Sequence, residues 1–360
     1  MVIWHRHHMV TMPYRKTKGG GCMAAADGNP KMADVARLAG VSLTTVGRVL
    51  HNNGYVSGEN RKRVEAAVKK LGYVPNTLAQ SLKSGVQMIG HILQFSPNML
   101  FAQISRAVDE ACTRQGYSVL SFTKYGLPGE DERIVTEFIG RRMSGVILTS
   151  IGQFDPGLVK KLERAGIPLV WIERAPERSD RVLLDDQAGT YSATQTMLRA
   201  GHKKIAYIGL ENGQAVEALR LEGYRQALAE AGLPLEKDFI KIVPDYHPAS
   251  GCKAMQALWE QGRRPTAVFG AADTLIAGAM QYLYQAEVKI PTDISLMGYD
   301  NTISAMLSPP VDSVGIYAGE MGQKAVELLL KRRQELEGPP ETVWVGTELV
   351  DRGTVVPPME

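Results

Sequence analysis

The pattern of apolar and polar positions divides the chain into a short helical stretch and a longer region in which strands and helices alternate. Between residues 31 and 74, apolar residues recur at the three-to-four-residue spacing of amphipathic helices. From residue 88 onward, short apolar runs of strand length alternate with amphipathic segments of helix length. This order predicts a small all-α domain followed by an α/β region with parallel sheets.

Two short helices separated by a tight turn open the helical stretch. The sequence predicts helices over residues 32–39 and 43–50. In the turn between them, Gly40 can adopt a positive φ and Ser42 is a good N-cap. The first helix is expected to bury one side, formed by Val35, Leu38 and Ala39. Two short helices across a turn that contains glycine are the helix-turn-helix pattern.

A third helix is predicted to begin at Ser57. Its apolar residues follow the i, i+3, i+4, i+7 spacing, at Val64, Ala67, Val68 and Leu71. Its other face carries five basic side chains, those of Arg61, Lys62, Arg63, Lys69 and Lys70. Taken by itself, this pattern also fits any small three-helix domain with a solvated basic face.

The region from residue 88 to residue 357 predicts two α/β lobes, because it is longer than a single such domain needs. Strands are expected over 88–94, 118–122, 145–150, 168–173, 204–209, 266–270 and 293–300. Helices are expected between them, including 101–115, 187–200, 216–231 and 275–286. Ligands bind beyond the carboxyl ends of the strands in open α/β sheets. Two lobes can therefore face each other across a ligand-binding cleft.

Charge is distributed unevenly along the 360 residues. Residues 1–87 hold 13 Lys and Arg against 4 Asp and Glu, a balance of +9 within the overall net charge of +3. A basic first quarter on an acidic remainder favours a polyanionic partner for that quarter. The three cysteines lie far apart without metal-ligand spacing, which fits a reducing cytoplasm and predicts neither a disulfide framework nor a metal site.

Residues 1–30 are interpreted as a disordered extension or a misassigned start. They are polar and glycine-rich and contain no continuous apolar core of a signal peptide. Their histidines, at positions 5, 7 and 8, have no Cys or carboxylate at ligand spacing. No apolar run reaches the length of a membrane span, so we expect a cytoplasmic protein that does not enter a membrane.

The stretch DVARLAGVSLTTVGRVLHNNGYVSGENRKRVEAAVKKLGYVPNTLAQSLKSG, residues 34–85, resembles the DNA-binding head of the LacI/GalR repressor family. The resemblance implies a helix-turn-helix domain over 31–74, whose second helix enters the major groove of operator DNA. It assigns DNA contacts to Ser42, Leu43, Thr44, Thr45, Arg48 and Tyr55. One departure is Gly47, where the family usually has serine; glycine removes a hydroxyl and lowers helix propensity.

Residues 75–86 are interpreted as a hinge. The segment TLAQSLK can form a helix but is too short to be stable alone, and a plain linker is the alternative. The resemblance implies that two copies pair on DNA, with Leu82 wedged into the minor groove and Ala79 as a further DNA contact. Leu78, Ala79 and Leu82 form a compact apolar face suited to such a pair.

The body, residues 87–357, resembles the periplasmic-binding-protein-like sensor of the same family. The segments that carry this resemblance are LLDDQAG, LRAGHKKIAYIG, RLEGYRQAL, AADTLIAGA and IPTDISLMGYDN. The resemblance assigns effector contacts to Arg220, Tyr246 and Asp300. Asp273 either contacts the effector or caps its helix, and Phe101 either lines the mouth of the cleft or packs in the core. Ala272 and Ile316 stand where the family commonly has polar residues, so the pocket is not a copy of a well-known lactose or purine site.

The resemblance implies a transcription regulator, expected to repress carbohydrate-related genes. A homodimer would bind pseudo-palindromic double-stranded DNA, and a sugar or sugar derivative in the cleft would change its operator affinity. No cofactor is expected. A tetramer is not expected either, because the sequence after Leu349 holds no heptad run.

The sequence disfavours two other functions. An enzyme is disfavoured because the chain contains no GxGxxG after a strand, P-loop, HExxH or GxSxG motif. A solute-binding protein of a transporter would share the body but should carry a signal peptide and no basic head.

Overall fold

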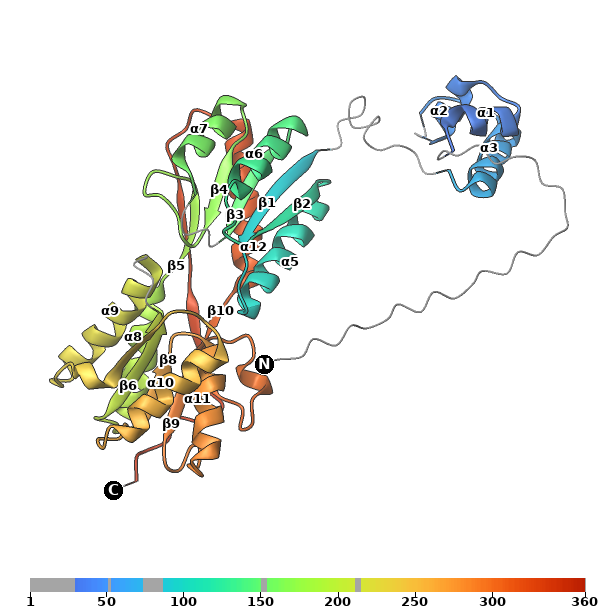
Figure 1. Cartoon of the computed structure of the whole chain (residues 1–360). Coiled ribbons are helices and arrows are strands. Elements are labelled where there is room, and N and C mark those ends of the chain that lie inside the picture. The colour runs from blue at the N-terminus through green and yellow to red at the C-terminus, as the bar shows by residue number, and fades with distance from the viewer. Residues whose placement is uncertain (1–29, 51–52, 74–86, 150–153, 211–214, 360) are drawn as a thin grey trace, which may run out of the picture. The chain divides into compact units, whose positions relative to one another are not determined.

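The computed structural model describes residues 30–50, 53–73, 87–149, 154–210 and 215–359. The chain divides into two compact units, with the boundary between residues 84 and 85 (Figure 1). The first unit is the helical head and the second is the α/β body. The extension predicted over residues 1–30 lies almost entirely outside the described residues, and the hinge predicted over 75–86 lies wholly outside them.

The head is built from three helices around a small apolar core. They are α1 (Met32–Ala39), α2 (Leu43–Leu50) and α3 (Gly58–Leu71). Gly40 ends α1 at a φ of 64°, and the Ser42 hydroxyl caps α2 by accepting the Thr45 N–H at 3.1 Å. The core consists of Val35, Ala36, Ala39, Val46, Val49, Val64 and Ala67.

One side chain in the head departs from the predicted core. Leu38 was expected to be buried beside Val35 and Ala39, yet it is 44% exposed. The buried side of α1 is instead completed by Ala36. The spacing of Val35 and Leu38 is compatible with one face, but the head core forms along Val35, Ala36 and Ala39 and leaves Leu38 outside.

The first lobe of the body is a six-stranded parallel sheet between two pairs of helices. Its strands have the order β11-β5-β4-β3-β1-β2. The bounds are β1 (Met88–Gln94), β2 (Ser118–Lys124), β3 (Gly145–Thr149), β4 (Leu169–Ile172), β5 (Arg181–Leu184) and β11 (Thr342–Val345). One face packs against α5 (Met99–Arg114) and α12 (Ala318–Gln334), and the other against α6 (Glu130–Gly140) and α7 (Pro156–Arg164).

The second lobe repeats this plan with one antiparallel edge strand, β12, which pairs with β10. The order is β12-β10-β9-β8-β6-β7. The bounds are β6 (Ile205–Leu210), β7 (Ile240–Val243), β8 (Ala267–Gly270), β9 (Ser295–Asp300), β10 (Asp312–Ile316) and β12 (Thr347–Val350). Helices α8 (Asp186–Arg199) and α9 (Ala215–Glu230) cover one face, and α10 (Pro248–Glu260) and α11 (Asp273–Gln285) cover the other. Two short 3-10 helices lie at Lys237–Phe239 and Ser304–Met306.

The chain crosses between the lobes three times, after β5, after β10 and between β11 and β12 (Figure 1). Each lobe is therefore completed by segments that are distant in the sequence. The predicted fold class, an all-α helix-turn-helix head followed by a two-lobed α/β body with parallel sheets, is confirmed. No helix among the described residues is long and apolar enough to span a membrane.

Glycines allow α10 and α11 to pack backbone against backbone. A Cβ atom at Gly278 would lie 1.8 Å from the carbonyl oxygen of Pro248, and one at Gly251 would lie 2.1 Å from that of Leu275. The packing fixes the segment before α10, which carries Tyr246, against the start of α11, which carries Asp273.

We expect Gly278→Ala to destabilise the body by about 1–3 kcal/mol, because the helices must separate to admit the methyl group. Gly319→Ala is the matched control, since its added Cβ would meet no atom within 4 Å. Thermal unfolding of the two variants checks this prediction. An unchanged melting temperature for Gly278→Ala would show that the close approach is not needed.

Candidate functional site

A small recess lies between the two lobes at the carboxyl ends of their strands. It is lined by Asn98, Leu100, Phe101, Glu173, Arg174, Val216, Arg220, Tyr246 and Asp300. Four of the five residues predicted to contact an effector thus lie on one surface: Phe101, Arg220, Tyr246 and Asp300. Phe101 is 9% exposed and lines the recess from the first lobe, at the start of α5.

Arg220 is buried in the second lobe and surrounded by acceptors. Its Nε donates to Asp186 Oδ1 at 2.7 Å and its Nη1 donates to the carbonyl oxygen of Ala271 at 2.7 Å. Its guanidinium carbon lies 4.0 Å from the centre of the Tyr299 ring. Burial acts to lower the pKa of Arg220, but Asp186 together with Tyr299, Tyr246 and Asp300 more than offsets this, so the pKa is raised and the group stays charged.

Asp300 is the last residue of β9 and reaches across to the first lobe. Its Oδ2 accepts a hydrogen bond from Nδ2 of Asn98, the N-cap of α5, at 2.5 Å. Its Oδ1 is buried, lies 3.9 Å from Arg220 Nη2 and accepts no hydrogen bond. Burial raises the pKa of Asp300 to about 7, although Arg220 acts in the opposite direction. The carboxyl group is therefore poised between its two protonation states near neutral pH.

A second contact between the lobes joins Arg174 to Glu217. Arg174, which follows β4, donates to Glu217 Oε1 of α9 at 2.5 Å, and the Tyr246 hydroxyl donates to the same oxygen at 3.0 Å. The Arg174 and Glu217 side chains are 15% and 5% exposed. Tyr246 is half-buried, and its ring forms part of the recess. This network holds Tyr246 in place from both lobes.

Asp273 occupies a different place from the one predicted. It does not line the recess, and the N-cap of α11 is Ala272. Its Oδ2 accepts backbone N–H groups of residues 302, 303 and 304, and its Oδ1 accepts the Ser313 hydroxyl at 2.7 Å. The helix-cap alternative is therefore wrong, while contact with an effector stays a prediction. Asp273 instead fixes the loop that follows Asp300.

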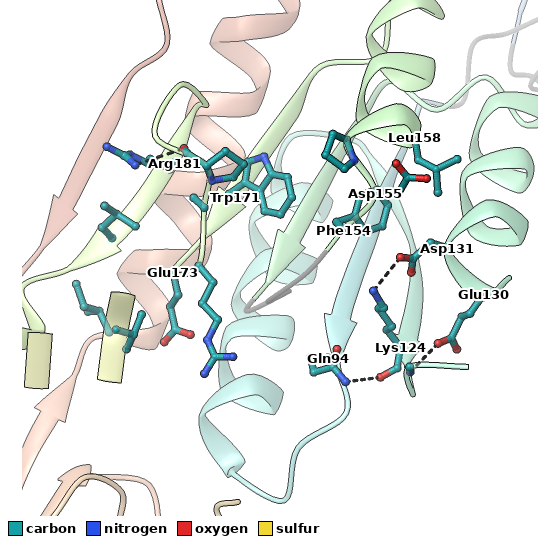
Figure 2. Close-up of a pocket in the computed structure, with 18 of the residues that line it drawn as sticks. Gln94, Lys124, Glu130, Asp131, Phe154, Asp155, Leu158, Trp171, Glu173 and Arg181 are labelled. Carbon is teal, nitrogen blue, oxygen red and sulfur yellow. Dashed lines mark hydrogen bonds and ion pairs between the residues drawn. The ribbon is translucent and has the colours of Figure 1, made fainter. Parts of the chain in front are cut away.

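The recess continues into a larger groove of about 1330 Å³ along the first lobe. Glu173, Arg174 and Val216 line both. In the groove, Lys124 lies 2.9 Å from Asp131, and Glu130 holds the loop after β2 by accepting three backbone N–H groups (Figure 2). Trp171 and Phe154 supply an apolar wall, with their rings 6.3 Å apart edge to face. There is room here for a ligand larger than the recess alone would hold.

Sequence reasoning missed several polar residues of the site. Asn98, Glu173, Arg174 and Glu217 were not selected, and Asp186 was quoted only within a motif. Glu173 ends a predicted strand and Arg174 follows it directly, so the rule that ligands bind at carboxyl ends of strands could have selected them. Glu217 and Asn98 carried no such signal. Among the described residues, no cluster of His, Cys, Asp or Glu could hold a metal ion.

In the head, the start of α2 presents an exposed surface. Leu43 is 51% exposed and Tyr55 is 90% exposed, while Thr44 and Arg48 are also exposed. The Ser42 hydroxyl, which caps the helix, is also hydrogen-bonded to the Thr45 hydroxyl at 2.9 Å. Ala79 and Leu82, predicted to contact DNA in the hinge, lie outside the described residues.

Gly47 lies in the middle of α2 without any structural need for glycine. A Cβ atom at this position would be 3.6 Å from the Met32 methyl group, an ordinary contact. The serine that the family usually has would therefore fit.

Comparison with known proteins agrees with both units. Residues 31–76 match the model of bacterial regulatory proteins of the lacI family, and residues 194–355 match a periplasmic binding protein-like domain. The HTH-type transcriptional repressor PurR of Actinobacillus pleuropneumoniae serotype 3 (strain JL03) is 34% identical over 328 residues, which is 89% of this chain and 97% of the relative. The chain belongs to the LacI family of bacterial regulatory proteins.

Two solved structures extend the likeness of this LacI-family protein to both units. A transcriptional regulator CelR–cellobiose complex is 30% identical, with a TM-score of 0.68 and coverage of 90% of this chain and 99% of that one. The lac repressor dimer bound to operator and the anti-inducer ONPF is 26% identical, with a TM-score of 0.77 and coverage of 91% and 100%. The predicted family is thus confirmed.

We expect Asp300→Asn to flatten the dependence of stability on pH. The folded-state pKa of Asp300 is raised from 3.8 to about 7, so the folded protein holds this proton more tightly than the unfolded chain does. The free energy of unfolding therefore falls as pH rises through that interval. Asparagine keeps an acceptor for Asn98 and removes the charge. Melting temperatures between pH 5 and pH 8 check this, with the exposed Asp238→Asn as control; parallel curves for wild type and Asp300→Asn would contradict it.

We expect Gly47→Ala to stabilise the head by about 0.5–1 kcal/mol, because alanine restricts the unfolded chain and fits the helix. Gly54→Ala is the contrasting control, since Gly54 has a φ of 80° and alanine would be strained there. Thermal unfolding followed by circular dichroism checks both. A destabilised Gly47→Ala head would mean that the contact with Met32 is tighter than it is in this structure.

Proposed function

We propose that this LacI-family protein represses carbohydrate-related genes by binding operator DNA, and that a sugar or sugar derivative bound between the lobes changes its operator affinity. The observation that carries this proposal is that one chain combines an exposed helix-turn-helix surface with a polar recess between two lobes. The protein acts in the cytoplasm and without catalysis. The curated relative reported above is likewise a transcriptional repressor.

The DNA-binding role is supported by the chemistry of α2. Exposed Leu43 and Thr44 stand at the start of the helix, where side chains reach base edges in the major groove. Arg48 and Tyr55 are exposed and suited to bases or phosphates. The lac repressor structure is a dimer bound to operator, and we propose a homodimer on a pseudo-palindromic site here too. In this proposal Ala79 and Leu82 contact the minor groove.

The sensor role is supported by the polar contacts that join the lobes. Asn98–Asp300 and Arg174–Glu217 both bridge the recess, so a ligand placed there would change the contacts on which the relative position of the lobes depends. The similar CelR structure holds cellobiose, which favours a carbohydrate. Coupling between two such sites is typically about 1–3 kcal/mol.

We expect Arg48→Ala to weaken binding to the protein's own upstream DNA by about 1–3 kcal/mol, because a guanidinium contact to a base or phosphate is lost. Fluorescence anisotropy with labelled DNA at fixed salt checks this. Repeating the titration at several salt concentrations distinguishes a lost base contact from a lost phosphate contact, since loss of a phosphate contact lowers the salt dependence of DNA binding.

Arg225→Ala serves as the control, because it removes a guanidinium from the surface of α9 in the body. It should bind DNA as the wild type does. Equal binding by Arg48→Ala and wild type, or no preference of the wild type for its upstream DNA over competitor, would contradict the proposed function.

A further inference from the structure

The segment that follows β12 has no regular secondary structure, yet it is bound tightly to the second lobe. It comprises residues 351–359. Thr354 is 1% exposed; its carbonyl oxygen accepts the Leu296 N–H at 3.1 Å, and its hydroxyl donates to the Leu296 carbonyl oxygen at 2.8 Å. Two residues further on, the Val356 carbonyl oxygen accepts a hydrogen bond from His202 Nε2 at 2.8 Å. The segment is therefore part of the lobe and not a loose tail.

This segment supplies the hydrogen-bond donors for a buried carboxylate. Asp312, the first residue of β10, is 3% exposed. Its Oδ1 accepts the backbone N–H groups of Arg352 and Thr354 at 2.5 and 3.1 Å, and its Oδ2 accepts that of Val355 at 3.0 Å. A carboxylate is costly to bury unless it is hydrogen-bonded. The carboxylate of Asp312 therefore fixes the path of residues 352–355.

Arg352 joins the same segment to both ends of the loop between β9 and β10. Its Nη2 donates to Asn301 Oδ1 at 2.6 Å, and its Nη1 donates to the Val311 carbonyl oxygen at 2.9 Å. Asn301 is the first residue of this loop and Val311 is the last. Asn301 Oδ1 also accepts the Ser304 hydroxyl at 2.9 Å. One half-buried guanidinium thus holds the loop closed at its base.

The start of this loop is strained and depends on such contacts. The φ angle is 90° at Asp300 and 52° at Asn301, two successive non-glycine residues in the region that favours glycine. Such a conformation costs free energy and persists only where its surroundings fix it. Asp273 holds the backbone N–H groups of residues 302–304 from one side, and Arg352 holds the Asn301 side chain from the other.

We propose that residues 351–356 form a clasp that positions the recess from outside, with Arg352 as the positioning residue. Among the described residues, Arg352 does not line the recess. It acts through Asn301, whose neighbour Asp300 makes the contact with Asn98 of the first lobe. Loosening the clasp frees the start of the loop and so weakens the binding of a ligand between the lobes. Only this last consequence rests on the proposed function.

Hydrogen exchange on the full-length protein tests the positioning without any ligand. Arg352→Met removes the donors and keeps an unbranched side chain. We expect exchange at the amides of residues 302–304 to become roughly fivefold faster or more, while exchange in α8 and α9 stays unchanged. Arg352→Lys keeps a cationic donor and should restore part of the protection. Unchanged exchange at 302–304, or a uniform increase throughout the second lobe, would overturn the proposal.

Arg225→Met is the matched control, because it removes an exposed guanidinium from α9 in the same lobe. It should leave exchange at residues 302–304 as in the wild type.

A double-mutant cycle tests whether Arg352 acts through Asn301. Asn301→Gly removes the side-chain acceptor and suits the positive φ. Arg352→Met should then accelerate exchange at residues 302–304 much less in the Asn301→Gly background than in the wild type. Equal acceleration in the two backgrounds would show that Arg352 does not act through Asn301, and would overturn the proposal.

Isothermal titration calorimetry with cellobiose and with ribose tests the consequence for the recess. A sugar that binds the wild type should bind Arg352→Met roughly fivefold more weakly or worse, and bind Arg225→Met unchanged. Equal affinity for Arg352→Met despite faster exchange would overturn the claim that the clasp positions the recess. If neither sugar binds the wild type, the carbohydrate of the proposed function is contradicted, while the exchange data and the cycle still decide on the clasp.

Discussion

The buried guanidinium of Arg220 is the constraint on which the recess between the lobes depends. A buried arginine remains charged, so its surroundings must supply acceptors. Asp186 at the start of α8, the Ala271 carbonyl after β8 and the Tyr299 ring on β9 provide them. Tyr299 also donates to Asp186 at 2.9 Å, which closes the cluster. The contacts of this one guanidinium therefore hold three elements of the second lobe around α9. One of these elements is β9, whose last residue, Asp300, projects toward the first lobe.

The two lobes are joined at the recess by polar contacts that contacts to a ligand could replace. Asn98–Asp300 and Arg174–Glu217 are single hydrogen bonds or ion pairs across the recess, and neither belongs to an apolar core. A ligand that donates to Asp300 competes with or adds to these contacts at little cost in packing. The chain crosses between the lobes three times, so a change in their relative position would have to be accommodated at these three crossings. This is the physical basis on which effector binding can be coupled to DNA binding.

The sequence predicted the local features of this protein well and the long-range ones poorly. Periodicity and capping residues placed the bounds of α1 and α2 correctly, and Ser57 does cap α3. The predicted burial of Leu38 was wrong because burial depends on which side of α1 packs against the other two helices. The resemblance assigned Arg220, Tyr246 and Asp300 to one site, and the structure places all three on the surface of one recess. It could not show that Asp273 binds the backbone of residues 302–304, or that Glu217 pairs with Arg174, since those partners are set by packing between distant segments.

We propose that the recess and the DNA-binding surface are energetically coupled in one molecule. The most direct test is to measure by calorimetry the affinity of the tightest-binding sugar with and without saturating upstream DNA, and by anisotropy the affinity for that DNA with and without saturating sugar. Linkage requires the two ratios to be equal, and we predict an equal change of roughly five-fold or more in both. Sugar binding that is unaffected by DNA, together with DNA binding that is unaffected by sugar, would contradict the account.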